Sequence, residues 1–93
     1  MTTTVVNKYR DDFDVYIGRG SKWGNPYSHL PSSYTGVIKV DTREEAIEKF
    51  EIYLLTNENL MNDLGELKGK RLGCFCKPKA CHGDVLAKYA EMV

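Results

Sequence analysis

The stretch Arg71-Leu-Gly-Cys-Phe-Cys-Lys-Pro-Lys-Ala-Cys-His-Gly-Asp84 decides how the fold of this 93-residue chain is interpreted. Residues 71–75 predict a short strand, and the helical spacing of the apolar positions that follow predicts a final helix over 81–92. A strand followed closely by a helix is a building unit of α/β domains. All three cysteines and one of the two histidines lie in this stretch, which therefore predicts a functional site between strand and helix.

The rest of the chain extends the same pattern. Apolar or β-branched runs predict further strands at 4–8, 14–18 and 36–40, the last of which could instead be the arm of a hairpin. Thr42 and Glu45 form an S/T-x-x-E capping box, which predicts a helix start, and the apolar residues of 60–67 predict a second, shorter helix. The order of elements predicts one α/β domain over 1–93, with a small Rossmann-like sheet, some parallel pairing and about three helices.

Composition narrows the class of protein. Lysine and arginine balance aspartate and glutamate at 13 each, so the strong basic excess of a general nucleic-acid binder is missing. No apolar run approaches the roughly 18–20 residues that span a bilayer, and the first residues lack the pattern of a signal peptide. An odd number of cysteines favours a reducing compartment over a disulfide framework. We therefore expect a cytoplasmic protein without a membrane segment.

The first candidate site is the polar loop that follows the second strand. Glycines there allow the backbone to approach a ligand, cationic side chains suit a phosphate or carboxylate, and aromatic rings could cover a base or sugar. The predicted ligand-binding residues are Arg19, Gly20, Ser21, Lys22, Trp23, Gly24, Asn25 and Tyr27. The alternative is a structured surface loop in which Trp23 enters the core and the two cations are merely solvated.

The second candidate site is the cysteine cluster, for which several interpretations stay open. Cys74, Cys76, Cys81 and His82 could ligate zinc, although their spacing is not that of the usual zinc knuckles. Cys81 could be a nucleophile, because a helix N-terminus stabilises a thiolate. The cysteines could also be small buried apolar side chains.

We favour a fourth interpretation, in which the start of the last helix holds the anionic part of a ligand without metal or covalent chemistry. Backbone N–H groups and His82 would bind the anion, while Asp84 caps the helix or orders a hydroxyl group. The predicted ligand-binding residues of this segment are Cys76, Lys77, Cys81, His82, Gly83 and Asp84. Elsewhere, the pattern predicts an exposed loop position for His29 and core or core-edge positions for three tyrosines, Tyr9, Tyr16 and Tyr53.

Two motifs together, R-G-S-K-W-G-N-P-Y at 19–27 and C-F-C-K-P-K-A-C-H-G-D at 74–84, resemble a family of small domains of unknown function in bacteriophages and bacteria. That family pairs an R-x-S-x-x-G-N-P-[FY] loop with a C-W-C-x-P-x-x-C-H-G-D signature, separated by an amphipathic helix that 43–50 supplies here. Phe75 stands where the family most often has tryptophan. The resemblance implies an α/β domain in a viral setting and no particular catalytic activity.

The sequence therefore predicts a protein that binds a nucleotide or a related phosphate-bearing ligand, with both motif loops at the carboxyl ends of neighbouring strands. Viral nucleotide metabolism and capture of a host signalling nucleotide are both compatible with this. The alternative is a zinc-stabilised module that binds and inhibits a host protein. No cofactor is expected, a homo-oligomer is compatible with the sequence, and no acid–base pair or triad indicates whether the ligand is turned over.

Overall fold

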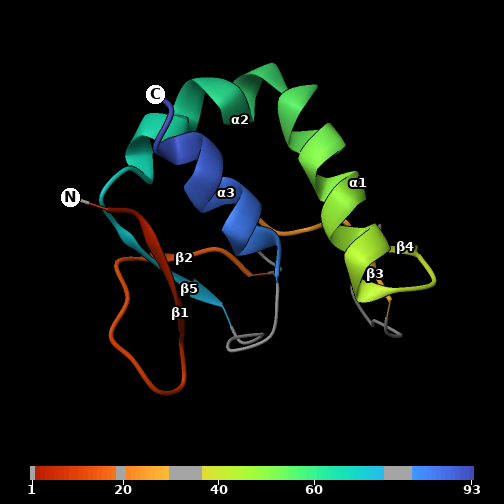
Figure 1. Ribbon diagram of the computed structural model, residues 1–93, viewed down its shortest axis with the longest axis horizontal. Helices are drawn as coiled ribbons and strands as arrows, with labels where there is room; N and C mark the ends of the chain where they lie inside the picture. The colour runs from red at the N-terminus through yellow and green to blue at the C-terminus, as the bar shows by residue number, and fades with distance from the viewer. Residues whose placement is uncertain (1, 19–20, 30–36, 75–80) are drawn as a thin grey trace.

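The computed structural model describes residues 2–18, 21–29, 37–74 and 81–93 and contains a three-stranded parallel sheet (Figure 1). The strands are β1 (Thr4–Asn7), β2 (Val15–Tyr16) and β5 (Arg71–Cys74). Their order is β1-β5-β2, and both pairs are parallel. All three were predicted from the sequence, β1 and β2 at somewhat greater length, and the predicted last residue of β5, Phe75, lies outside the described residues.

The register of the sheet sets where loops can meet. Leu72 of β5 lies between Val5 of β1 and Val15 of β2. Backbone hydrogen bonds continue just past two of the strands, from Lys8 N to Cys74 O at 2.8 Å and from Ile17 N to Gly73 O at 3.1 Å. Because all three strands run the same way, the segments that follow them leave from one edge, called the carboxyl edge below.

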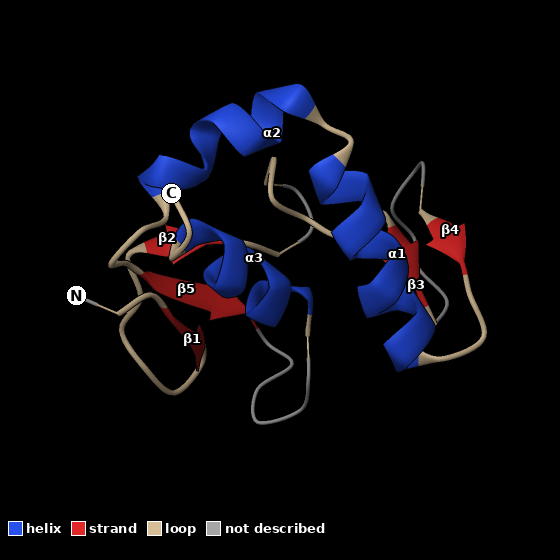
Figure 2. Ribbon diagram, turned by 45° about the horizontal axis from the view of Figure 1, so that its top comes forward, coloured by secondary structure: helices blue, strands red, loops and turns tan. Residues whose placement is uncertain are grey.

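The helices are α1 (Arg43–Leu55), α2 (Glu58–Asp63), the short 3₁₀ helix η1 (Leu64–Glu66) and α3 (His82–Ala90). Helix α3 packs on β1 and β5, and α1 packs on α3 (Figure 2). The predicted helices are confirmed, and with the parallel sheet they make this an α/β fold. Among the described residues, no helix is long and apolar enough to cross a membrane.

A second, two-stranded sheet was only half predicted. Strand β4 (Ile38–Lys39) lies within the predicted 36–40, but its partner β3 (Tyr27–Ser28) falls in a segment expected to be loop. The two strands are parallel, so the hairpin alternative is wrong: Ile38 N donates to Pro26 O at 2.7 Å and Val40 N to Ser28 O at 2.8 Å. Helix α1 packs against β3 and ties this small sheet to the rest of the fold.

Helix α1 begins as the capping box predicts, with one change in its partner. The N–H of Glu45 donates to Thr42 Oγ1 at 3.0 Å, which satisfies one of the free donors of the first turn. The Glu45 carboxylate reaches one residue further back than in the standard box and accepts from Asp41 N at 2.9 Å. Helix α2 is capped similarly, because Asn57 Oδ1 accepts from Leu60 N at 3.2 Å.

The core lies between the sheet and the helices. Its largest fully buried side chains come from β5, α1, α3, the end of β2 and the α2–β5 region: Ile17, Phe50, Leu54, Leu64, Leu67, Leu72 and Leu86. The apolar positions of α1 recur at helical spacing, so one stripe of that helix faces this core.

One tyrosine and one histidine are placed differently from the sequence prediction. The prediction that Tyr9 belongs to the core or its edge is wrong, because the residue is 76% exposed. Strand β1 ends at Asn7, whose Oδ1 accepts from Tyr9 N at 2.9 Å, so the chain turns away from the sheet there. Tyr16 and Tyr53 are half-buried, as expected of core-edge residues, and so is His29, which was expected to be exposed.

Candidate functional site

The two motifs meet at the end of β2. His82 Nε2, from the second motif, lies 2.7 Å from Ile17 O, and Ser21 Oγ, from the first motif, donates to Gly18 O at 2.6 Å. A carbonyl can only accept, so His82 donates this hydrogen bond through its Nε2–H group. Two consecutive carbonyls at the carboxyl edge are thus each held by a different motif.

The start of α3 lies unusually close to the sheet. A Cβ atom on Gly83 would stand 2.6 Å from Ile17 Cδ1 and 2.9 Å from Val5 Cγ1, distances that real Cβ atoms do not show. The His82 ring is nearly buried and meets Phe50 of α1 edge-on, with 4.9 Å between centroids and 75° between planes. Gly83 and His82 therefore fix α3 against β2 and α1.

Cys81 and Asp84 close the N-terminus of α3. Cys81 is the N-cap residue, and its N–H donates to Asp84 Oδ2 at 3.2 Å, as a capping-box acid does at the third helical position. Cys81 Sγ lies 3.1 Å from Cys74 Sγ, and both residues are buried. Within the described ranges, no group of three or more potential ligands is arranged to hold a metal ion.

The first motif uses Lys22 differently from the sequence prediction. Lys22 Nζ lies 2.9 Å from Asp63 Oδ2 and 3.1 Å from Glu66 Oε1. Hydrogen bonds from the ammonium to Asp63, and then to Glu66, raise the pKa of Lys22. In this structure the cation fastens the loop to α2 and η1.

Trp23 is not a ligand-facing platform, because it is only 2% exposed and belongs to the core. The alternative interpretation is therefore right about the Trp23 ring, but not about Lys22, which is ion-paired rather than merely solvated. Asn25 is also buried, and it bridges two elements: Nδ2 donates to Ala46 O of α1 at 3.1 Å, and Oδ1 accepts from Tyr27 N at 2.9 Å. Gly24 N donates to Ser21 O at 3.1 Å and closes a turn.

Tyr27, the other predicted aromatic cover, lies in β3 and is half-buried. Lys49 Nζ of α1 lies 6.0 Å from its ring centroid. Four predicted site residues lie outside the described residues: Arg19, Gly20, Cys76 and Lys77. Arg19 and Gly20 come after Gly18 in the sequence, and Cys76 and Lys77 come after Cys74.

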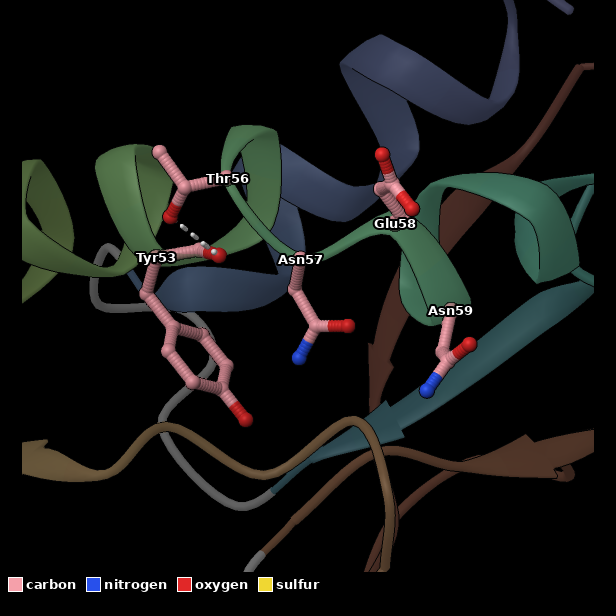
Figure 3. Close-up of a pocket in the computed structure, with 5 residues that line it drawn as sticks. All are labelled: Tyr53, Thr56, Asn57, Glu58 and Asn59. Atoms are coloured by element: carbon pink, nitrogen blue, oxygen red, sulfur yellow. Dashed lines mark hydrogen bonds between the residues drawn. The ribbon is translucent and has the colours of Figure 1, made fainter.

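A polar hollow that the sequence did not suggest lies where α1 turns into α2 (Figure 3). Its volume is about 490 Å³, and it is lined by Tyr53, Thr56, Asn57, Glu58 and Asn59. Figure 3 shows the side chains of Tyr53, Asn57 and Asn59 pointing to the same side. The only signal in the sequence is the polar run 57–59, which caps and begins α2, a composition that many helix starts share.

Comparison with known proteins identifies relatives without a described activity. The family DUF4326, a domain of unknown function, matches residues 3–92. An uncharacterized 12.4 kDa protein in the nrdA-td intergenic region of Enterobacteria phage T4 is 46% identical over 89% of this chain and 72% of its own length. The uncharacterized protein R718 of Acanthamoeba polyphaga mimivirus is 30% identical over 86% of this chain and 68% of its own length. No solved structure matches.

Proposed function

We propose that this protein, which belongs to the DUF4326 family, binds a nucleotide or a related phosphate-bearing small molecule at its carboxyl edge. One observation carries the proposal. The carbonyls of Ile17 and Gly18 are bound by His82 and Ser21, so both motifs are joined at one point of the sheet. Parallel α/β sheets bind ligands at this edge, beyond the carboxyl ends of their strands.

The proposal divides the motif residues into two groups. The first group has a structural role, because its contacts fasten the two motifs to α1, α2 and the sheet. It consists of Lys22, Trp23, Asn25, His82 and Gly83. We assign anion binding to Arg19, to Lys77 and to the backbone N–H groups at the start of α3. Arginine offers planar paired donors to a phosphate, and a helix N-terminus adds oriented N–H groups.

The nature of the ligand rests on chemistry and on analogy. Small Rossmann-like domains bind nucleotides with a loop after a strand and the N-terminus of the next helix, a fold-level likeness that carries little weight alone. In a viral setting, the ligand would belong to nucleotide metabolism or to host signalling by nucleotides, in the cytoplasm of the infected cell. Binding is what we propose, because the sequence shows no acid–base pair or triad that would indicate turnover.

Thermal unfolding with a panel of mono-, di- and cyclic nucleotides and nucleotide sugars tests the proposal. A ligand at about 100 times its Kd stabilises the folded protein by about 2.7 kcal/mol, which raises Tm by several degrees. No shift with any member of the panel would remove the proposal.

Substitutions of Arg19 then test where the ligand binds. Arg19→Ala should weaken binding by about 2–3 kcal/mol, because charge-assisted hydrogen bonds are the strong ones, and Arg19→Lys should restore only part of it. Arg71→Ala is the matched control, since Arg71 begins β5 at the opposite edge and pairs with Asp14 at 3.3 Å. Equal losses in the Arg19 and Arg71 variants would contradict a site at the carboxyl edge.

A second candidate function is the zinc-stabilised module that binds a host protein. The 3.1 Å separation of the Cys74 and Cys81 sulfur atoms favours it, because two thiols already converge. Against it, His82 Nε2 is already hydrogen-bonded to Ile17 O. Metal analysis separates the two functions: one zinc per chain, with unfolding on chelation, supports the module, and a metal-free, chelator-indifferent protein rejects it.

A further inference from the structure

Cys74 and Cys81 form a thiol pair that joins the central strand to the last helix. Their sulfur atoms lie 3.1 Å apart, with Cys74 at the end of β5 and Cys81 at the N-cap of α3. A disulfide bond is about 2.05 Å long, so the two sulfur atoms need to approach by only about 1 Å. The pair is thus already near bonding geometry.

Both thiols of the pair are buried. Cys74 is 2% exposed and Cys81 is 3% exposed, and both belong to the core cluster. His82, next to Cys81 in sequence, directs Nε2 to Ile17 O and so does not use that nitrogen as a base for either thiol. What the geometry offers is reaction of one sulfur with the other.

We propose that Cys74 and Cys81 are a modification site, at which a small peroxide reversibly forms an intrachain disulfide. The Cys81 thiol, at the N-terminus of α3, loses its proton, and the resulting thiolate attacks one oxygen of hydrogen peroxide. The O–O bond breaks to give a sulfenic acid, and the departing hydroxide takes up the proton from the thiol and leaves as water. The Cys74 sulfur then displaces the hydroxyl group as a second water while the S–S bond forms. Two thiols lose two electrons and two protons, and one peroxide becomes two waters.

Peroxide is the fitting oxidant because the pair is buried. A molecule close to water in size needs only a small local opening near the start of α3, whereas a bulky disulfide reagent needs a larger one. An intracellular disulfide of this kind is transient and redox-sensing rather than structural, which fits the odd cysteine count. A dithiol reductant reverses the bond by thiol–disulfide exchange.

The bond would close a short ring between β5 and α3. That ring contains residues 75–80, and therefore Cys76 and Lys77 of the second motif. Cross-linking restricts the unfolded chain, so the oxidised protein should melt several degrees higher than the reduced one. The inference does not depend on the proposed ligand, because every measurement below is made on the protein alone.

Peptide mapping after peroxide treatment is the direct experiment, and Cys76→Ser protein makes it unambiguous. Trypsin, which cleaves after Lys79 but not before Pro78, gives peptides 72–79 and 80–88. With Cys76 removed, only a Cys74–Cys81 bond can link these two peptides. We expect the linked pair at low peroxide, a mass lower by two hydrogen atoms, and separation of the peptides on reduction.

A measurement on the wild-type protein shows whether the result depends on a folding defect caused by Cys76→Ser. Wild-type protein should fall from three alkylatable thiols to one after peroxide, measured after unfolding. Cys81→Ser should form no linked peptides in either background. Unlinked peptides with both thiols retained, or with both oxidised separately to sulfinic acids, would overturn the proposal, as would a wild-type bond that maps to Cys76.

Discussion

Asn25 and His82 belong to different motifs, and both direct their polar atoms to backbone groups of distant elements. Asn25 Nδ2 donates to Ala46 O of α1, and His82 Nε2 to Ile17 O at the end of β2. Each residue is less than one-tenth exposed, so each bond replaces one that the unfolded chain makes with water. In the structure, these two motif residues therefore position the backbone of the candidate site.

The amide of Asn25 is tested by replacing it with the carboxylate of the same shape. Asn25→Asp removes the donor 3.1 Å from Ala46 O and sets a negative charge against that carbonyl in a buried place. We expect the free energy of unfolding to fall by about 2–3 kcal/mol, measured by urea denaturation.

Asn57→Asp is the matched control for this prediction. Asn57 caps α2 with its acceptor oxygen, 3.2 Å from Leu60 N, and aspartate caps as well as asparagine does. The control should therefore stay within about 0.5 kcal/mol of the natural protein. If both aspartate variants lost the same stability, the donor of Asn25 would not be what matters.

Gly83 gives a second prediction at the scale of single residues. Alanine suits a helix interior better than glycine by about 1 kcal/mol, yet here its Cβ would collide with Ile17 and Val5. Overpacking costs about 1–3 kcal/mol, so Gly83→Ala should destabilise the protein by about 1 kcal/mol in net terms. Gly65→Ala, whose Cβ would meet nothing within 4 Å, should be neutral or slightly stabilising in the same urea titration. A stabilised Gly83→Ala protein would mean that α3 can move off the sheet without cost.

At the scale of elements, the parts that the sequence predicts are those with local causes. Helix α1 begins after Thr42 because the side chain of Thr42 satisfies an N–H three residues on, and both partners are visible in the sequence. Strand β3 was missed because only its parallel pairing with β4 makes Tyr27 and Ser28 a strand. That partner lies about ten residues away, and the sequence around Tyr27 and Ser28 does not predict the pairing.

The cap of α1 gives the prediction for this scale. Thr42→Ala leaves the Glu45 N–H without its side-chain acceptor and should lower the free energy of unfolding by about 1 kcal/mol. Thr56 lies at the other end of the same helix, and its hydroxyl donates to Ile52 O and Tyr53 O. Thr56→Ala should change the free energy of unfolding by less than about 0.5 kcal/mol. Equal effects, judged by urea midpoints at constant m-value, would contradict the role of the cap.

At the scale of the whole molecule, the strand order β1-β5-β2 brings the motifs together. The sequence predicts strands and their sequential order, but not that β5 enters between the first two. Nor does it say which aromatic side chains face inward: Trp23 lies in a polar motif and is buried, whereas Tyr9 follows an apolar strand and is exposed. Such choices depend on packing between elements far apart in the chain.

The two ends of the described chain are tied by one acidic side chain, which makes stability depend on pH. Glu91 Oε2, just beyond α3, accepts from Thr3 Oγ1 at 2.7 Å and from Thr3 N at 3.2 Å, and Thr3 Oγ1 in turn accepts from Gly69 N at 2.8 Å. The hydroxyl bond, followed by the backbone bond, holds the pKa of Glu91 below its ordinary value of 4.5. The folded state therefore binds this proton less readily than the unfolded state.

Stability from this carboxylate is consequently present above pH 4.5 and is lost as the pH falls through the lowered pKa of the folded state. Glu91→Gln should be less stable than the natural protein at neutral pH, because a neutral amide accepts more weakly. The gap between the two should close in acid, measured by urea denaturation at a series of pH values. Thr3→Ser is the control, because it keeps the hydroxyl and should leave the pH profile unchanged. If the difference in stability between Glu91→Gln and the natural protein persisted at low pH, the charge of Glu91 would not be what stabilises this contact between the ends of the chain.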